Sequence, residues 1–175
     1  MPKVSVCMPV YNTNPDHLRQ AIESALSQTF KDFEFLILND SPDNKNLKKI
    51  VSEYKDSRIV YLENKKNIGI SEARNKLVKI SRGEYLAVCD HDDISVPDRF
   101  EKQVAILDKN PAIGVVSAQI KWFPNKEVRW QSRNPIKNYD IKTQLMTGCA
   151  VLHPVSMIRK SVMIENEVFY ENRFS

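Results

Sequence analysis

The feature that most constrains the fold is a repeated alternation of short apolar runs with amphipathic segments. Five apolar, β-branched runs have the composition of strands buried on both faces, at 4–10, 33–38, 58–62, 85–89 and 113–118. Between them, apolar residues recur at helical spacing, which predicts helices after Asn14-Pro15 and at 46–54, 71–80, 98–107 and 139–146. Strands that alternate with helices predict an α/β fold with a mostly parallel central sheet flanked by helices.

Composition excludes several classes of protein. Lys and Arg number 26 against 22 Asp and Glu, and a net charge of +4 is too small to predict a nucleic-acid partner. The apolar runs are far shorter than a membrane span, and the first residues lack the apolar core of a signal peptide. The three cysteines, Cys7, Cys89 and Cys149, are widely spaced in apolar stretches, so we expect reduced core thiols in a cytoplasmic protein.

Polar side chains follow each of the first four predicted strands. The strand exits read Tyr11-Asn12, Asn39-Asp40-Ser41, 64–67 (Asn-Lys-Lys-Asn) and 90–93 (Asp-His-Asp-Asp). Ligands of open α/β sheets bind outside the carboxyl ends of the strands, where these loops converge. The sequence therefore predicts one binding site at that edge of the sheet.

The acidic exit 90–93 is the sharpest of these signals. Three carboxylates within four residues repel one another unless a cation or strong donors offset their charge. In an extended backbone Asp90 and Asp92 project to the same side, and carboxylate oxygens suit Mn²⁺ or Mg²⁺ better than zinc. A solvated acidic loop that caps the helix after Pro97 is the other interpretation. Because such metals are commonly completed by substrate phosphates, a nucleotide ligand is plausible.

Other nucleotide folds lack their motifs here. No Gly-x-Gly-x-x-Gly follows the first strand and no Gly-Lys-Ser/Thr loop occurs, which argues against a dinucleotide fold and a P-loop ATPase. A nucleotidyltransferase would need a Gly-rich basic loop where the chain has Asn12-Thr13-Asn14-Pro15.

Four motifs together resemble the N-terminal, nucleotide-sugar-binding part of a family 2 glycosyltransferase with the GT-A fold. In order they are Pro9-Val10-Tyr11-Asn12, Asn39-Asp40-Ser41, Asn67-Ile68-Gly69 with Ala73-Arg74-Asn75, and Asp90-His91-Asp92-Asp93. The resemblance covers residues 2–118 most firmly, and a later segment with His153-Pro154 also looks like the family. It implies that residues 1–175 form a single GT-A domain, truncated at its C-terminal end.

The resemblance also implies roles for individual residues. Arg74 would contact the diphosphate, and Pro9, Tyr11 and Asp40 would line the pocket for the base and ribose. The other implied nucleotide-binding residues are Val10, Asn12, Asn39, Asn67, Asp90 and His91. Asp90 and Asp92 would be the DxD pair that holds Mn²⁺ or Mg²⁺. Arg suits bidentate phosphate recognition and Tyr11 could stack on a base, whereas a helix-surface Arg and a core Tyr are the structural alternatives.

The implied reaction is inverting transfer of a sugar from a nucleoside diphosphate, with a UDP-sugar favoured, to a hydroxyl of a glycan or lipid-linked acceptor in surface polysaccharide synthesis. Such a displacement needs a metal for the departing diphosphate and a carboxylate for the acceptor's proton. The family's acidic motif would begin about where the chain stops, at Ser175, which leaves Glu171 as the candidate base. A non-catalytic nucleotide-sugar-binding module is the alternative.

One basic, aromatic segment, 121–137, has no assigned role. It interleaves Trp122 and Trp130 with Arg129 and Arg133. The segment could face an acceptor glycan or an anionic membrane surface, placing the protein at the inner membrane face, or it could be a solvated loop with two buried tryptophans.

Overall fold

A computed structural model describes residues 1–123 and 127–172 of the chain. The first half is a regular alternation of strands and helices: β1 (Val4–Val10), α1 (Pro15–Leu26), β2 (Phe33–Asn39), α2 (Lys45–Ser52), β3 (Ile59–Glu63), α3 (Ile70–Ile80), β4 (Tyr85–Val88) and α4 (Arg99–Lys109). The predicted elements are therefore confirmed here, with boundaries shifted by one or two residues at several ends.

The second half is less regular. It contains β5 (Val115–Val116), β6 (Lys121–Trp122), β7 (Trp130–Gln131), α5 (Asn138–Leu145), the short 3-10 helix η2 (His153–Val155), β8 (Met157–Arg159) and α6 (Lys160–Glu165). The fifth predicted strand, 113–118, is wrong in length, because only two of its residues join the sheet. Of the segment 121–137, residues 124–126 lie outside the described part, as does Ser175 at the chain end.

The main sheet has the strand order β3-β2-β1-β4-β8-β5. β3, β2, β1 and β4 run parallel, in a register that pairs Val4 of β1 with both Phe33 and Tyr85. β8 pairs antiparallel with β4 on one side and with β5 on the other. The mostly parallel sheet is confirmed, but this late antiparallel strand was not predicted.

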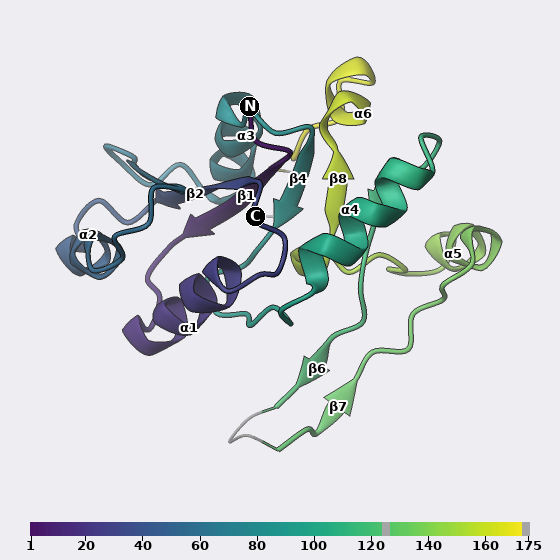
Figure 1. The fold of residues 1–175 in the computed structure, drawn as a ribbon, viewed down its shortest axis with the longest axis horizontal. Helices are drawn as coiled ribbons and strands as arrows, with labels where there is room; N and C mark the ends of the chain where they lie inside the picture. Colours follow the sequence, from purple (N-terminus) through teal and green to yellow (C-terminus); the bar gives the residue numbers. More distant parts are fainter. Residues whose placement is uncertain (124–126, 173–175) are drawn as a thin grey trace.

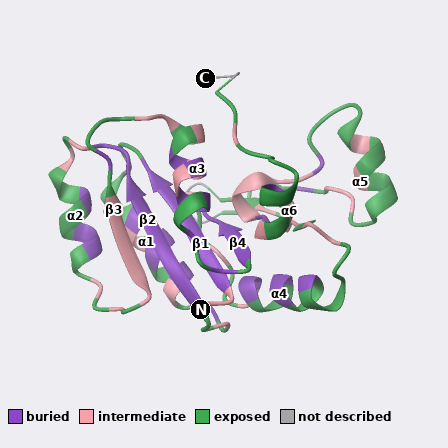
Figure 2. Cartoon of the chain, turned by 90° about the horizontal axis from the view of Figure 1, so that it is seen from above, coloured by how far each residue is buried: buried purple, intermediate pink, exposed green. Residues whose placement is uncertain are grey.

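The two faces of the sheet carry separate cores. Alternate residues of β1, such as Val6 and Met8, pack with α1, α2 and α4, whereas Cys7 faces α3 and α6. β1, β2 and β4 are buried along their lengths and β3 is half-buried at the edge (Figure 2). Burial on both faces explains why these strands are almost continuously apolar in sequence.

The β6–β7 hairpin and α5 lie apart from this sheet (Figure 1). No residue of α5 is buried, and Trp122 and Trp130 are 58% and 52% exposed. The interpretation of 121–137 as a loop with two buried tryptophans is therefore wrong. Cys149 is also exposed, so only Cys7 and Cys89 are core thiols as predicted. No helix in the described ranges is long and apolar enough to cross a membrane.

Candidate nucleotide site

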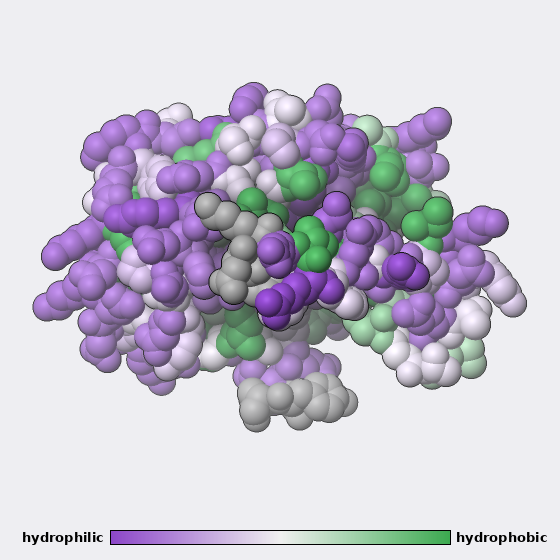
Figure 3. Space-filling view, turned by 90° about the horizontal axis from the view of Figure 1, so that it is seen from below, coloured by the Kyte–Doolittle hydropathy of each residue, from purple (hydrophilic) through white to green (hydrophobic). Residues whose placement is uncertain are grey.

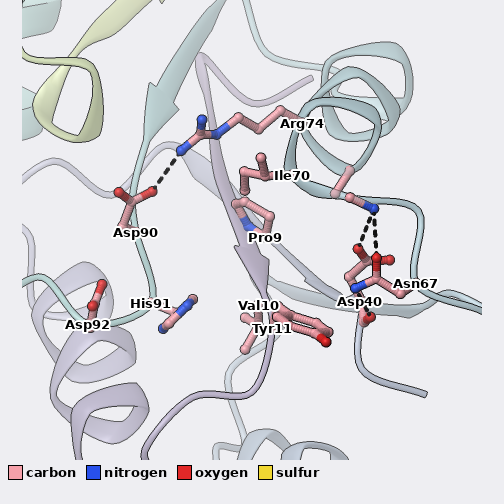
Figure 4. Close-up of a pocket in the computed structure, with 12 residues that line it drawn as sticks. Pro9, Val10, Tyr11, Asp40, Asn67, Ile70, Arg74, Asp90, His91 and Asp92 are labelled. Atoms are coloured by element: carbon pink, nitrogen blue, oxygen red, sulfur yellow. Dashed lines mark hydrogen bonds and ion pairs between the residues drawn. The ribbon is translucent and has the colours of Figure 1, made fainter. Parts of the chain in front are cut away.

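A cleft of about 510 Å³ lies at the carboxyl ends of β1, β2 and β4, beside the first turns of α3 (Figure 4). The parallel strands bring the strand exits to this edge, because each strand ends on the same side of the sheet. The cleft is lined by Pro9, Val10, Tyr11, Asp40, Asn67, Gly69, Ile70, Ala73, Arg74, Asp90, His91 and Asp92.

Eight residues that the sequence assigned to nucleotide binding line this cleft, together with Asp92, and two do not. Asn39 is buried, and its amide donates to the Tyr61 hydroxyl at 3.0 Å and accepts from the Ser41 amide at 2.7 Å. Asn12 follows β1 with a φ of 44°, and its backbone amide donates to the Ser41 hydroxyl. Both asparagines shape the loops beside the cleft rather than its lining.

The acidic exit of β4 forms a turn at His91 and Asp92 instead of the expected extended backbone. Asp90, His91 and Asp92 nevertheless all line the cleft. Desolvation, followed by the charges of Asp90 and Asp92, raises the pKa of the adjacent Asp93. The turn therefore concentrates negative charge, which a hard cation would offset.

The donor set limits how a metal could be held. In the part of the chain that the structure describes, no three His, Cys, Asp or Glu side chains are grouped to hold an ion. Asp90 and Asp92 offer oxygen ligands only, which fits Mg²⁺ or Mn²⁺ and not a closed zinc site. Two carboxylates leave most coordination positions to water or to a ligand's phosphates.

Arg74 projects from α3 toward the acidic turn (Figure 4). Its Nη2 atom donates to Oδ1 of Asp90 at 3.2 Å, and its side chain is only 22% exposed. Its Nε atom is buried without a hydrogen-bond partner. Arg74 is therefore a cleft residue and not a solvated helix-surface arginine, and it places a guanidinium beside the proposed metal ligands.

Asp40 is engaged by the loop that leads into α3. Its carboxylate accepts hydrogen bonds from the Asn64 side chain at 2.7 Å and from the backbone amides of Ile68 at 3.0 Å and Gly69 at 3.1 Å. Asn67 donates to the Asp40 backbone carbonyl at 3.2 Å. These bonds use most of the acceptor capacity of the carboxylate, so Asp40 fixes the cleft wall around the helix start.

Tyr11 lies at the mouth of the cleft, at the end of β1. It is 53% exposed, so the core-tyrosine alternative is wrong. Pro9 and Val10 precede it on β1 and add apolar lining to the cleft (Figure 4). The ring is therefore accessible to a flat ligand that enters the cleft.

Three lining residues were missed as site residues: Gly69, Ile70 and Ala73. Gly69 and Ala73 belong to the motifs that carry the resemblance, so their position in those motifs was the available signal, whereas Ile70 lies between the two motifs. Glu171 does not line the cleft; its backbone carbonyl accepts from the Ser71 hydroxyl at 3.2 Å, near the start of α3. Asn172 lines a second hollow, which also includes Asn67.

Comparison with protein families and curated proteins gives consistent results. The model of the family described as Glycosyl transferase family 2 matches residues 5–166. A protein named as an uncharacterized glycosyltransferase from Methanocaldococcus jannaschii is 36% identical over 166 residues, 93% of this chain and 57% of its own length. The chain thus spans somewhat more than half the length of such relatives.

Solved structures share the fold at low sequence identity. The structure of residues 1–349 of S. aureus TarS has a TM-score of 0.77 at 19% identity, and the match covers 99% of this chain and 51% of that structure. The same part of TarS has also been solved with UDP-GlcNAc. The mannosyltransferase PcManGT from Pyrobaculum calidifontis, in complex with GDP-Man and Mn²⁺, has a TM-score of 0.71 at 16% identity; the match covers 98% of this chain and 48% of PcManGT. At these identities the likeness shows the fold alone.

Proposed function

This chain belongs to glycosyl transferase family 2, and from that premise we propose that its cleft binds a nucleoside diphosphate sugar for inverting transfer to an acceptor hydroxyl. The observation that carries the proposal is the pairing of Arg74 with Asp90 at 3.2 Å in a cleft that also holds Asp92 and Tyr11. These residues offer an aromatic face, a phosphate-binding cation and an acidic pair in one cavity.

Each group has a distinct task in this proposal. Tyr11 stacks on the base, and the planar guanidinium of Arg74 donates to diphosphate oxygens in a fork that matches their geometry. Asp90 and Asp92 hold Mn²⁺ or Mg²⁺. When bound, the metal supplies positive charge against the negative charge that develops on the departing diphosphate. Arg74 adds to that charge stabilisation without a proton transfer.

The nucleotide itself is proposed as UDP. TarS, which shares this fold, is solved with UDP-GlcNAc, whereas PcManGT is solved with GDP-Man. Both donors are therefore chemically reasonable on such a scaffold, and direct competition between nucleotides decides between them.

The experiment is calorimetric titration of UDP, GDP, dTDP and ADP, with and without Mn²⁺, into the wild type and Asp92→Asn. We expect one nucleotide to bind only with metal, and the variant to lose that binding. Asp140→Asn, an exposed acid on α5 outside the cleft, is the matched control and should bind as the wild type does. Metal-independent binding of equal strength to the wild type and Asp92→Asn would refute the assignment of Asp92.

Transfer also requires a carboxylate that removes the acceptor's proton. Glu171 is the proposed base, at the edge of α3. A non-catalytic nucleotide-sugar-binding module is the second candidate, and it is favoured by the absence of Glu171 from the cleft lining. Release of nucleoside diphosphate from a UDP-sugar by the wild type, and its loss in Glu171→Gln with donor binding retained, would establish the first candidate and exclude the second.

The proposed acceptor is a glycan or a lipid-linked acceptor in surface polysaccharide synthesis, reached from the cytoplasmic face of the membrane. Support comes from the β6–β7 hairpin, where exposed Trp122 and Trp130 pair across the strands beside Lys121 and Arg129. Hydrophobic patches lie among hydrophilic side chains on the face seen in Figure 3. Exposed tryptophans with basic neighbours suit a peripheral contact with an anionic membrane interface.

Vesicle titration tests the membrane contact. Tryptophan emission should shift to the blue with vesicles that contain phosphatidylserine, and not with neutral phosphatidylcholine vesicles. The chain has two tryptophans, so the emission of Trp122→Phe comes from Trp130 alone, and that of Trp130→Phe comes from Trp122 alone. An unchanged spectrum and no cosedimentation with anionic vesicles would exclude this contact.

A further inference from the structure

Residues 168–172 run back across α3 after α6 has ended. The turn at the end of α6 places Glu167 at a φ of 52°, and the Val168 amide donates to the Met163 carbonyl at 2.9 Å. The pattern is that of a helix C-cap in which a left-handed residue redirects the chain. The segment that follows is thereby brought to the helix that carries Arg74.

Asn75 holds this segment against α3 with two hydrogen bonds. Its Oδ1 atom accepts from the Tyr170 amide at 2.9 Å, and its Nδ2 atom donates to the Tyr170 carbonyl at 2.9 Å. Asn75 is buried and Tyr170 half-buried, so both bonds are partly shielded from water. An asparagine that satisfies both backbone groups of one residue fixes the point from which that residue's side chain projects.

The ring of Tyr170 lies between Arg74 and His153. The guanidinium carbon of Arg74 is 5.6 Å from the centre of the Tyr170 ring, and the His153 ring meets the same ring edge-on at 5.3 Å. A hydrogen bond of 2.8 Å joins the Tyr170 hydroxyl to Nε2 of His153. Burial raises the pKa of Tyr170 to about 12 and lowers the pKa of His153, so both rings are neutral near pH 7.

We propose that Tyr170 is a positioning residue for Arg74: anchored by Asn75 and His153, its ring holds the guanidinium toward Asp90, ready to receive the diphosphate of the donor. This inference rests on the proposed function. It assigns a role to a segment that lies more than 90 residues after Arg74 in sequence and outside the cleft lining.

The physical reason is the freedom of an arginine side chain. Four rotatable bonds must be ordered before the guanidinium can donate to two phosphate oxygens at once, and that ordering opposes binding. An aromatic face beside a partly buried cation removes much of this freedom in the free protein. The benefit is specific for the diphosphate, because the base and ribose do not contact Arg74 in this proposal.

The first arm of the test needs no nucleotide. In ¹⁵N-labelled protein, the Nε–H signal of Arg74 is identified by its absence in Arg74→Lys. We expect nuclear Overhauser contacts between the Arg74 side chain and the Tyr170 ring, and water exchange of this proton should be about tenfold faster in Tyr170→Leu. Tyr170→Phe keeps the ring and the Asn75 bonds but loses the bond to His153, so it should raise the exchange rate less than Tyr170→Leu does. Tyr139→Leu, at an exposed position on α5, is the control.

The second arm compares UDP with UMP in the presence of Mn²⁺. Tyr170→Leu should weaken UDP binding about tenfold and UMP binding less than twofold. In an Arg74→Ala background, Tyr170→Leu should have no further effect on UDP, because the residue acts through Arg74. If Tyr170 had a purely structural role, Tyr170→Leu would weaken the binding of UDP and UMP alike, and it would still weaken UDP binding in the Arg74→Ala background.

The outcomes separate this inference from the proposed function. A wild type that binds no nucleotide refutes the proposed function and, with it, the diphosphate role of Tyr170. A wild type that binds UDP, with an unchanged Arg74 signal and unchanged affinity in Tyr170→Leu, refutes the positioning role alone. If Tyr170→Leu does not fold, the Overhauser contacts in the wild type decide, and their absence would overturn the inference.

Discussion

Gly69 sits at the junction between the Asp40 network and α3, in a backbone conformation that other residues avoid. Its φ is 82° and its ψ 160°, and its amide donates to the Asp40 carboxylate at 3.1 Å and to Asn67 Oδ1 at 3.1 Å. Only glycine adopts this region at low cost. A single residue thus allows the chain to turn into α3 and to place Arg74 over the cleft.

Replacement of Gly69 by alanine should therefore lower the free energy of unfolding by about 2 kcal/mol. The cause would be backbone strain and not a steric clash, since an added Cβ has no neighbour within 4 Å. Gly148→Ala is the matched control, because that site is equally open and lacks the positive φ. Urea unfolding measures the stability of both variants. Equal unfolding midpoints for Gly69→Ala and Gly148→Ala would contradict the role of backbone strain.

At the scale of elements, Arg99 ties the start of α4 to the acidic turn and to β8. Its Nη2 atom donates to the carbonyls of Val88 at 2.6 Å and Ser156 at 3.2 Å, and its Nη1 atom donates to the Ser95 hydroxyl at 3.0 Å. Arg99, Val88 and Ser156 are all buried, so the hydrogen bonds to the two carbonyls are shielded from bulk water, whereas Ser95 is half-buried. The residue spans both ends of the loop that holds Asp90 and Asp92.

Arg99→Leu should destabilise the fold by about 3 kcal/mol, because it takes a donor from the buried Val88 carbonyl and leaves the Ser156 carbonyl with only the Val88 amide at 2.9 Å. It should also weaken metal-dependent nucleotide binding by loosening the acidic turn. The comparison is Arg133→Leu, at an exposed position, which should change neither property. Thermal unfolding and nucleotide titration measure the two effects; wild-type stability in Arg99→Leu would contradict the role.

The entry into β3 depends on an ion pair that responds to pH. Arg58 donates from Nη2 to Asp56 Oδ2 at 2.6 Å, and hydrogen bonding to Arg58 lowers the pKa of Asp56 to about 2. In the unfolded chain the carboxyl has a pKa near 3.9. Its stabilising effect is therefore complete above about pH 4 and is lost as pH falls from there toward 2.

Asp56→Asn should accordingly be less stable than the wild type by about 1–2 kcal/mol at pH 7, and the difference should close by about pH 2. Urea unfolding between pH 7 and pH 2 measures it, with Asp140→Asn as an exposed control. A stability difference that stays constant over this range would show that the effect does not come from titration of the carboxyl.

Local patterns predicted β1 to α4 well because their periodicity is long and unambiguous. Three-residue β8 offers no such pattern, and its place between β4 and β5 depends on pairings more than 40 residues apart. The cleft was predicted from strand exits that converge by topology. The contacts that shape the loops around the cleft were not predicted, because the hydrogen bonds from the Ile68 and Gly69 amides to Asp40 depend on a specific backbone conformation.

At the scale of the whole molecule, burial is uneven. β1 and β2 are buried at every residue, whereas α5 has no buried residue and the described part of β6 and β7 is exposed. Regions with few buried apolar contacts open at low free energy. We therefore expect native-state hydrogen exchange to be slowest in β1 and β2 and fast in α5. Exchange that is as slow in α5 as in β1 would contradict this expectation.

The position of β8 also bears on how the chain folds during synthesis. β4 ends at Val88, but the strand that covers its outer edge ends at Arg159, so the ribosome must add roughly 70 residues before β4 can be paired on that side. At about 10 residues per second this interval lasts several seconds. Throughout it the nascent chain presents an apolar strand edge that can template pairing with another chain. The strand order therefore exposes the nascent chain to chaperone binding during this interval, and to aggregation when no chaperone binds.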